Sequence, residues 1–540
     1  METFTPAPEL RRPESKDRVL SLVLIALAAL LRLGPIASGL PYIDYVDEGY
    51  VLHQATDLLN KRTFDTGWYG YPSLPAYLTA GVLMAEGGIY RYLHGHSFRS
   101  DLPREEGGLT NRRDNYDIIS PPELIVAGRL VAACLSLGTV LLAGGIATRL
   151  GGRAAGLLAI LITAVCPALV ARASNVIVDT FATFFALLAL YCCERLRSKS
   201  NNSWDGVIAL AAGMAAGLAF ASKYTAGAVF VPVILLLCTL SASKAGRVRL
   251  SLWASLGLFL GIALGAPAVI FKLRTVVNDL AGIAANYRII TSSPGYFGQS
   301  VSASELGWPL AIAGCAGFWL MLRRKSTRST AIGWGVFALV LLALFVGRPF
   351  QPFRNLLPLV PPFCIAAAIA FSALIGWAGQ GARPRRRLVL TVALISAGAV
   401  SLALPSFRQV QGRLAQRDSR VRAIDWLHQH ATREETVLGI RELAILPAEW
   451  KRIAARATVV SWFEASDLLE RQPFDYIVTG DFDLRYATDP ATSSANLARW
   501  NEKLSRMPVQ AVFGQVVTPV VPYLWRTNDE RIVIVRRNAP

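Results

Sequence analysis

The stretch "GRLVAACLSLGTVLLAGGIATRLGG", residues 128–152, gives the clearest indication of the fold. Apart from Arg129 near its start it is apolar for about twenty residues, the length that crosses a bilayer core. It ends at Arg149, and Arg153 follows shortly after. Short loops rich in Lys and Arg are typical of the cytoplasmic side of a membrane protein. The stretch therefore predicts a transmembrane helix followed by a cytoplasmic turn.

The same pattern recurs along a chain of 540 residues that is 53% hydrophobic and only 17% charged. These values are too apolar for a soluble enzyme of this length, and they predict a polytopic α-helical membrane protein with about eleven transmembrane helices. We read the first apolar run as a retained helix and not as a signal peptide, since it lacks a clear small-residue cleavage site. The predicted spans cover about residues 19–35, 123–148, 154–171, 178–194, 207–222, 224–241, 250–271, 305–322, 331–347, 355–378 and 388–405.

The formal net charge of +18 could indicate a nucleic-acid partner, but much of the positive charge lies in short loops between apolar runs. We therefore expect no nucleic acid and assign these loops, with the N-terminal residues 1–18, to the cytoplasm. The alternation then places residues 36–122 outside as one large loop, in which the apolar segment 73–93 lies on the outer interface. The basic loops are Arg149–Arg153, Arg195–Lys199, Lys244–Arg249, Arg323–Arg328 and Arg383–Arg387.

The composition changes after the predicted membrane domain, residues 19–405. Residues 406–540 are more polar, and "VRAIDWLHQH" (421–430) has helical periodicity. A small α/β domain on the external side is therefore expected. Its predicted strands are "ETVLGI" (435–440), "ATVVSWF" (457–463), "FDYIVTG" (474–480) and "RIVIVRR" (531–537).

Acidic residues gather where the chain leaves the first predicted span. Asp44, Asp47 and Glu48 lie in "YIDYVDEGY" (42–50), and Asp179 precedes the fourth span. A carboxylate at such a place could act as a general base or a metal ligand. The alternative for Asp47 and Glu48 is an acidic cap on the following helix, "EGYVLHQATDLLNK" (48–61), because acids favour helix N-termini.

Five basic residues occur on the side where the positive-inside pattern does not explain them. Cations at membrane depth are costly and usually face a cavity or a partner. Each could instead reach the interface or form a structural ion pair, but their recurrence on one side would suit a phosphate held at the outer leaflet. They are Arg129, Arg172, Lys223, Arg348 and Arg354.

Six pieces of the sequence, in order, resemble the GT-C superfamily of integral-membrane glycosyltransferases that use polyprenyl-phosphate sugars. The nearest groups are the dolichyl-phosphate-mannose protein mannosyltransferases and the lipid A aminoarabinose transferases. The pieces are "DYVDEGYVLHQA" (44–55), "YGYPSLPAYL" (69–78), the opening stretch 128–152, "CPALVARASNVIVDTFATFFALLALY" (166–191), "GMAAGLAFASKYTAGAVFVPV" (213–233) and "RNLLPLVPPF" (354–363).

The resemblance implies roles for matched residues. It implies that Asp47, with Glu48, is the catalytic acid of the first external loop and that Asp179 is a second acid. It also implies that Arg129, Lys223 and Arg354 lie near the donor cavity. Tyr71, which we include among the substrate-binding residues, stands about where aminoarabinose transferases carry a phosphate-holding lysine, and this departure argues against that substrate.

The resemblance implies transfer of a monosaccharide from a polyprenyl-phosphate donor to a lipid, glycan or protein hydroxyl, with inversion, by a multi-pass plasma-membrane protein. Two alternatives remain: a lipid or solute transporter, and a polysaccharide ligase or polymerase that uses lipid-pyrophosphate donors. No cofactor is certain, and a divalent metal is possible. His94 and His96 could ligate a metal, although exposed loop histidines are usually solvated. We interpret the stretch 272–304 as a lid.

Overall fold

The structure is a computed structural model. It describes residues 15–43, 45–94, 123–197, 204–240, 243–289, 295–346, 351–378, 384–415, 417–443, 445–480, 490–514 and 531–537. The chain divides into two compact units. The bundle unit comprises Met1–Ile36, Lys61–Gly81 and Arg129–Gln411, and the sheet unit comprises Ala37–Asn60, Val82–Gly128 and Gly412–Pro540.

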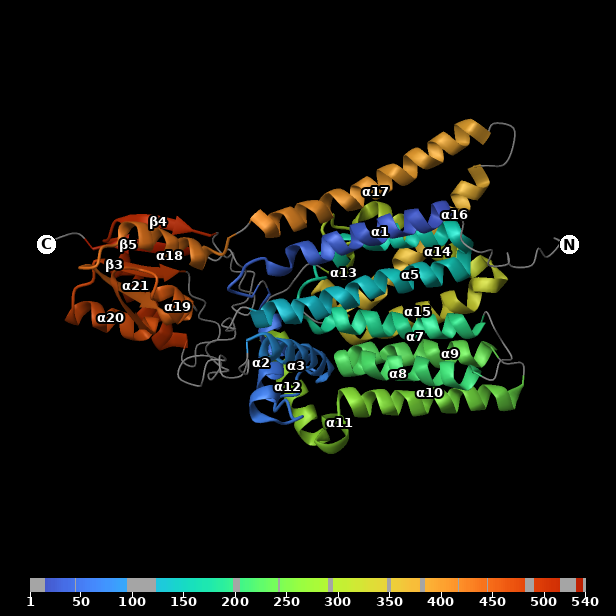
Figure 1. The fold of residues 1–540 in the computed structure, drawn as a ribbon, viewed down its shortest axis with the longest axis horizontal. Coiled ribbons are helices and arrows are strands. Elements are labelled where there is room, and N and C mark those ends of the chain that lie inside the picture. The colour runs from blue at the N-terminus through green and yellow to red at the C-terminus, as the bar shows by residue number, and fades with distance from the viewer. Residues whose placement is uncertain are drawn as a thin grey trace. The chain divides into compact units, whose positions relative to one another are not determined.

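Helices form at every predicted span (Figure 1). The two spans predicted between residues 123 and 171 belong largely to one segment, α5, which turns at Gly152, where φ is 83°. The helical segments before α17 are α1 (Ser15–Leu33), η1 (Gly34–Ala37), α2 (Val46–Lys61), α3 (Leu74–His94), α5 (Glu123–Ala164), α6 (Pro167–Val170), α7 (Val178–Arg197), α8 (Asp205–Ser222), η2 (Tyr224–Val229), α9 (Phe230–Leu240), α10 (Lys244–Gly265), α11 (Ala268–Phe271), α12 (Leu273–Ile289), α13 (Tyr296–Ser300), α14 (Gly307–Arg323), α15 (Lys325–Phe345), η3 (Phe353–Leu359) and α16 (Val360–Ala378).

The chain is thus a polytopic α-helical membrane protein. Among the described residues, 7 helices are long and apolar enough to cross a membrane. The number of about eleven membrane crossings therefore stays a prediction. The segment 73–93 is helical as α3, and its position at the interface likewise stays a prediction.

Close helix packing positions the residues that follow α8. A Cβ atom on Gly213 would lie 1.8 Å from the carbonyl oxygen of Ala254 in α10, and one on Gly257 would lie 2.1 Å from that of Leu210. Glycines spaced four apart on both helices therefore allow backbone to touch backbone, a common way to join helices within a bilayer. Figure 1 shows α7, α8 and α10 as neighbouring rods, so the end of α8 at Ser222 is held between two partners.

The stretch 272–304, which we interpreted as a lid, is mostly helical where the structure describes it. Helices α12 and α13 occupy most of its described part. Residues 65–69 are tied to this stretch, since the backbone N–H of Tyr69 donates to Asp279 Oδ2 at 2.7 Å. The role of this stretch as a lid stays a prediction.

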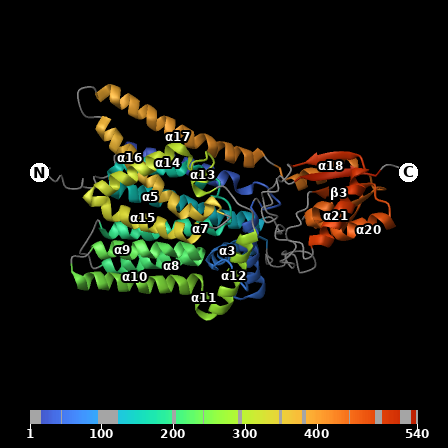
Figure 2. The ribbon, with the colours of Figure 1, turned by 180° about the vertical axis from the view of Figure 1, so that it is seen from behind.

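The sheet unit contains a five-stranded sheet, whose strand β3 is labelled in Figure 2. The strand order is β2-β1-β3-β5-β4. β1 pairs in parallel with β2 and β3, whereas β5 runs antiparallel to β3 and β4. Four strands match the predicted ones, and β4 was not predicted. The strands are β1 (Thr436–Ile440), β2 (Arg456–Val460), β3 (Tyr476–Gly480), β4 (Val509–Phe513) and β5 (Ile532–Arg536). Helix α17 (Pro384–Ala415) belongs to the bundle unit up to Gln411. The helices that follow it in the sheet unit are α18 (Ser419–His430), η4 (Arg441–Leu443), α19 (Pro447–Trp450), α20 (Trp462–Arg471) and α21 (Pro490–Ser505).

Candidate functional site

Two of the predicted site residues meet inside the bundle unit. Lys223 Nζ lies 2.5 Å from Asp179 Oδ1, although the two residues are 44 positions apart. The carboxylate is in the first turn of α7, where the helix dipole favours a negative charge. Lys223 is an extended residue between α8 and η2, and this break explains how two spans follow each other without an ordinary loop.

A third residue completes this cluster. Asn355 Oδ1 accepts a hydrogen bond of 2.8 Å from Lys223 Nζ, and the Asn355 side chain is 2% exposed. Its amide nitrogen Nδ2 is buried and has no hydrogen-bond partner within the part of the chain that the structure describes. A buried amide donor without an acceptor costs about 1–3 kcal/mol, so an oxygen-bearing ligand would relieve it. We call Asp179, Lys223 and Asn355 the lysine cluster.

Other predicted cations lie on different elements of the bundle unit. Arg354 precedes Asn355 in η3 and is buried. Arg129 is fully buried in α5, and its Nη1 donates to the carbonyl oxygen of Ile36 at 3.1 Å. Arg348 lies outside the described residues.

Tyr71 lies on the segment between α2 and α3. Its ring packs edge-on against Trp68, with centroids 5.6 Å apart. On the same segment Asp65 pairs with Lys272 and accepts from the Tyr69 hydroxyl. The hydrogen bond from Lys272, followed by that from Tyr69, lowers the pKa of Asp65 to about 2. Asp65, Tyr69 and Lys272, but not Tyr71, line an open hollow of about 500 Å³.

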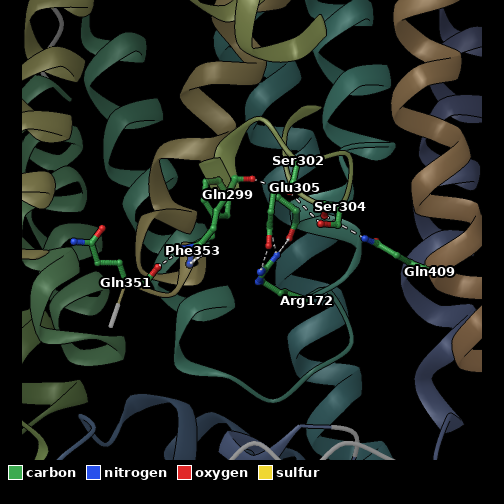
Figure 3. A network of polar contacts seen from close by, with 9 residues as sticks. Arg172, Gln299, Ser302, Ser304, Glu305, Gln351, Phe353 and Gln409 are labelled. Atoms are coloured by element: carbon green, nitrogen blue, oxygen red, sulfur yellow. Dashed lines mark hydrogen bonds and ion pairs between the residues drawn. The ribbon is translucent and has the colours of Figure 1, made fainter. Parts of the chain in front are cut away.

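Arg172 forms a closed ion pair. Its Nη1 and Nη2 lie 2.7 and 2.6 Å from the two carboxylate oxygens of Glu305 (Figure 3). Nη1 also donates to the carbonyl oxygen of Ala168. This two-point geometry matches a guanidinium to a carboxylate. A phosphate would have to compete with Glu305 for Arg172, so the predicted substrate contact of this residue stays a prediction.

The segment that carries Glu305 also supports η3. Gln299 Nε2 donates to the carbonyl oxygen of Gln351 at 2.6 Å, and Gln299 Oε1 accepts from the backbone N–H of Phe353 at 2.9 Å. Figure 3 shows this amide beside the start of η3. One side chain thus fixes both sides of the turn that leads to Arg354 and Asn355.

The two predicted acids of the first loop have different surroundings in the sheet unit. Glu48 is fully buried, and its Oε2 accepts from the backbone N–H of Tyr45 at 3.2 Å. Tyr45 precedes the first residue of α2, so Glu48 forms the glutamate half of a capping box. The cap that we weighed as an alternative role is therefore real for Glu48. Asp47 is 6% exposed in the same first turn.

The comparisons with known proteins agree with this architecture. Residues 123–271, well under half of the chain, match the family model described as dolichyl-phosphate-mannose-protein mannosyltransferase. ArnT from Cupriavidus metallidurans in the apo state is 14% identical, with a TM-score of 0.53 over 96% of this chain and 98% of that chain. The chain has a GT-C fold.

A second structure of the same protein, ArnT bound to undecaprenyl phosphate, gives 15% identity and a TM-score of 0.53 over 97% of this chain and 98% of that chain. At these identities the likeness concerns the fold alone. No curated protein sequence matches the chain. The resemblance to GT-C glycosyltransferases is confirmed, and the matched range contains Arg129, Asp179 and Lys223.

Sequence reasoning missed Asn355 and Glu305. Asn355 could have been suspected because it directly follows Arg354 in "RNLLPL", whereas nothing in "SASELGW" (302–308) marks Glu305 as a partner of Arg172. Among the described residues, no three His, Cys, Asp or Glu side chains could together hold a metal. His94 is the last residue of α3, and His96 lies outside the described residues.

Proposed function

We propose that this GT-C protein transfers a monosaccharide from a polyprenyl-phosphate donor to an acceptor hydroxyl at the outer face of the membrane, with inversion at the anomeric carbon. The GT-C fold supports the reaction class. The undecaprenyl phosphate bound to ArnT, which has the same fold, supports a polyprenyl-phosphate ligand.

The lysine cluster is the observation that carries the proposal. It offers an ammonium at 2.5 Å from Asp179 and a buried amide N–H that lacks an acceptor among the described residues. A phosphate has several oxygens and a negative charge, so it could accept from both donors at once. Asp179 holds the ammonium in place, and its predicted direct part in catalysis stays a proposal.

In the proposed reaction, the acceptor oxygen attacks the anomeric carbon of the donor while the bond from that carbon to the phosphate oxygen breaks. The electron pair of this bond goes to the phosphate, which leaves as polyprenyl phosphate. Lys223 and Asn355 stabilise the charge that develops there. Asp47 accepts the proton of the attacking hydroxyl, whereas Glu48 serves as the helix cap.

The test uses the purified full-length protein and a radiolabelled polyprenyl-phosphate sugar. Asp47→Asn keeps the shape of the side chain but removes its basicity, so transfer should fall by about 10²–10⁴-fold while donor binding persists. Asp44→Asn is the matched control, because it removes a neighbouring carboxylate and should lose less. Parent-like activity of Asp47→Asn would remove the general base, and donor binding without transfer by the parent would favour a transporter.

The outer location rests on the basic-loop pattern and needs its own test. Reporter fusions after Gly95 and after Arg417 should both report the external side. The basic loops are assigned to the cytoplasm, and the alternation of predicted spans then places both positions outside. A cytoplasmic signal at either position would overturn the proposed topology.

A further inference from the structure

We propose that Tyr42 is a positioning residue for the acidic segment 45–48. We further propose that the C-terminal α/β domain affects the reaction by holding Tyr42 in place through Arg420 and Leu446. This inference rests on the proposed function, because it assigns to the domain the task of holding the segment that carries Asp47. All three residues belong to the sheet unit.

Tyr42 is held on its face and at its hydroxyl. The guanidinium carbon of Arg420 lies 3.7 Å from the centroid of the Tyr42 ring, within the range of a cation–π contact. The Tyr42 hydroxyl accepts a hydrogen bond of 3.1 Å from the backbone N–H of Leu446. The tyrosine side chain is fully buried, and Val421 packs against it and Leu446.

The guanidinium that covers the ring is itself fixed. Arg420 donates from Nε and Nη2 to the two oxygens of Asp418, at 2.9 and 2.8 Å. Asp418 also caps α18, since its Oδ1 accepts from the backbone N–H of Arg420 at 2.8 Å. The cation therefore has little freedom to follow a moving ring. Tyr42 meets two separate elements of the domain, the start of α18 and the residue before α19.

The contacts of Arg420 and Leu446 with Tyr42, which we call the Tyr42 grip, lie close in sequence to the proposed base. Asp47 follows Tyr42 by five residues, and Ile43 between them is buried. From Tyr45 onward, the Glu48 cap fixes the first turn of α2. One end of the segment is thus fastened to the C-terminal domain and the other to a helix. A general base must reach its proton within about 3 Å, so a small shift of this segment would slow proton removal.

Burial raises the pKa of the Tyr42 phenol above its ordinary value, so the phenol stays neutral in any ordinary assay. A change in the pH dependence of the reaction on altering Tyr42 would then reflect other groups.

The experiment measures transfer against donor concentration, together with hydrogen exchange of the backbone amides, in the full-length protein. Arg420→Met removes the charge over the ring and keeps most of the bulk. Its kcat should fall about 10–100-fold, the scale of a misplaced catalytic group, while the donor KM stays within about twofold. Amides 45–50 should exchange faster, and those of β1 and β3 should not.

Arg536→Met is the matched control. Arg536 lies over the Tyr476 ring at 5.1 Å in the same unit, so it offers the same kind of contact away from Tyr42. Its kcat should match the parent. Parent-like kcat in Arg420→Met would overturn the proposal, and so would an equal loss in Arg536→Met, which would indicate a general effect on the domain.

Tyr42→Phe keeps the ring and deletes only the hydroxyl that Leu446 contacts. It decides the question if Arg420→Met does not fold: a lower kcat at unchanged donor KM supports the grip, and parent kcat overturns it. If the parent protein transfers no sugar, the proposed function fails, but exchange at residues 45–50 in either variant still tests the grip by itself.

Discussion

Two ion pairs in the bundle unit contain cations that the sequence marked in the same way, but the structure gives these cations different surroundings. Arg172 and Lys223 both stood out as basic residues that the positive-inside pattern does not explain. Arg172 meets both oxygens of Glu305 at 2.7 and 2.6 Å, which matches a guanidinium to a carboxylate. Lys223 meets one oxygen of Asp179 and one amide oxygen, beside an amide N–H that has no acceptor among the described residues.

The difference lies in what each pair can still bind. The side chains of Lys223 and Asp179 are 13% and 1% exposed, so the charges are buried in a site that offers a further donor. Arg172 and Glu305 are 18% and 14% exposed and match each other. An anion would therefore add to the lysine cluster, whereas it would have to displace a carboxylate from Arg172. We expect the first pair to govern the reaction and the second to govern stability.

Among these variants, Lys223→Met should have the largest effect on transfer. Loss of one cation from the leaving phosphate should lower kcat/KM by about 10²–10³-fold, the usual effect of removing one donor to developing charge. The measurement is the initial transfer rate at low donor concentration. The variant also leaves Asp179 buried without a counter-ion, which can cost about 3–5 kcal/mol of stability.

The double variant Lys223→Met/Asp179→Asn separates these effects. It removes both charges and should recover thermal stability without recovering transfer. A single Lys223→Met variant that turns over like the parent would show that the lysine is only a counter-ion.

Asn355→Asp would make the lysine cluster resemble the arginine pair. A second carboxylate would replace the amide donor and repel a phosphate, so the donor KM should rise by at least about tenfold, or about 1.4 kcal/mol of binding. Thermal stability should also fall, because one ammonium faces two buried carboxylates, so the donor KM is measured at a temperature at which both proteins are folded. Asn355→Gln, which keeps the amide, should lose less, and equal donor KM values for Asn355→Asp and the parent would contradict a phosphate at this place.

Arg172→Met should affect stability and leave catalysis nearly intact. Glu305 would lose its partner, and the melting temperature in detergent should fall by several degrees, since loss of a partly buried pair costs on the order of 1–3 kcal/mol. The transfer rate per folded molecule should stay within about threefold. Were this rate to fall as far as in Lys223→Met, Arg172 would have to be counted among the phosphate ligands after all.

A third ion pair of the bundle unit, Asp65 with Lys272, is more exposed than the other two. Its removal should have the smallest effect on stability. The hydrogen bond from Lys272 lowers the pKa of Asp65 from 3.8 to about 2. The pair therefore adds stability above pH 3.8 and loses it as the pH falls toward 2. Asp65→Asn should flatten this limb of a melting-temperature profile and change little at pH 7, because exposed pairs are weak. An unchanged acid limb would show that the pair adds nothing.

The parts of the fold that were predicted correctly are those with long, regular sequence patterns. Long apolar runs predicted a helix at each expected span, since a bilayer imposes length and composition locally. The strand β4, "VQAVF", was missed because its short run carries a weak signal and its exposed residues dilute it. Residues 272–304 were misjudged because glycine and proline in "NYRIITSSPGYFGQS" (286–300) suggested a loop, although α12 forms before them.

The site was predictable only in part. Residue type and topology selected Asp179 and Lys223, but their pairing depends on α7 and α8 lying side by side. Glu305 is 133 residues from Arg172, so no local pattern could show that this cation already has a partner. Glu48 was the opposite case: its role as a cap depends on residues three apart, and the sequence contained that information.

The seam between α8 and α10 has a consequence for the path of the donor's hydrocarbon tail. The backbones meet where a Cβ on Gly213 would come within 1.8 Å of the Ala254 carbonyl oxygen, so not even a methyl group fits there. An isoprenoid chain is much wider than a methyl group. If the proposed polyprenyl donor binds at Lys223, its lipid tail would have to approach along another side of α8, because the packed backbones leave no room between α8 and α10.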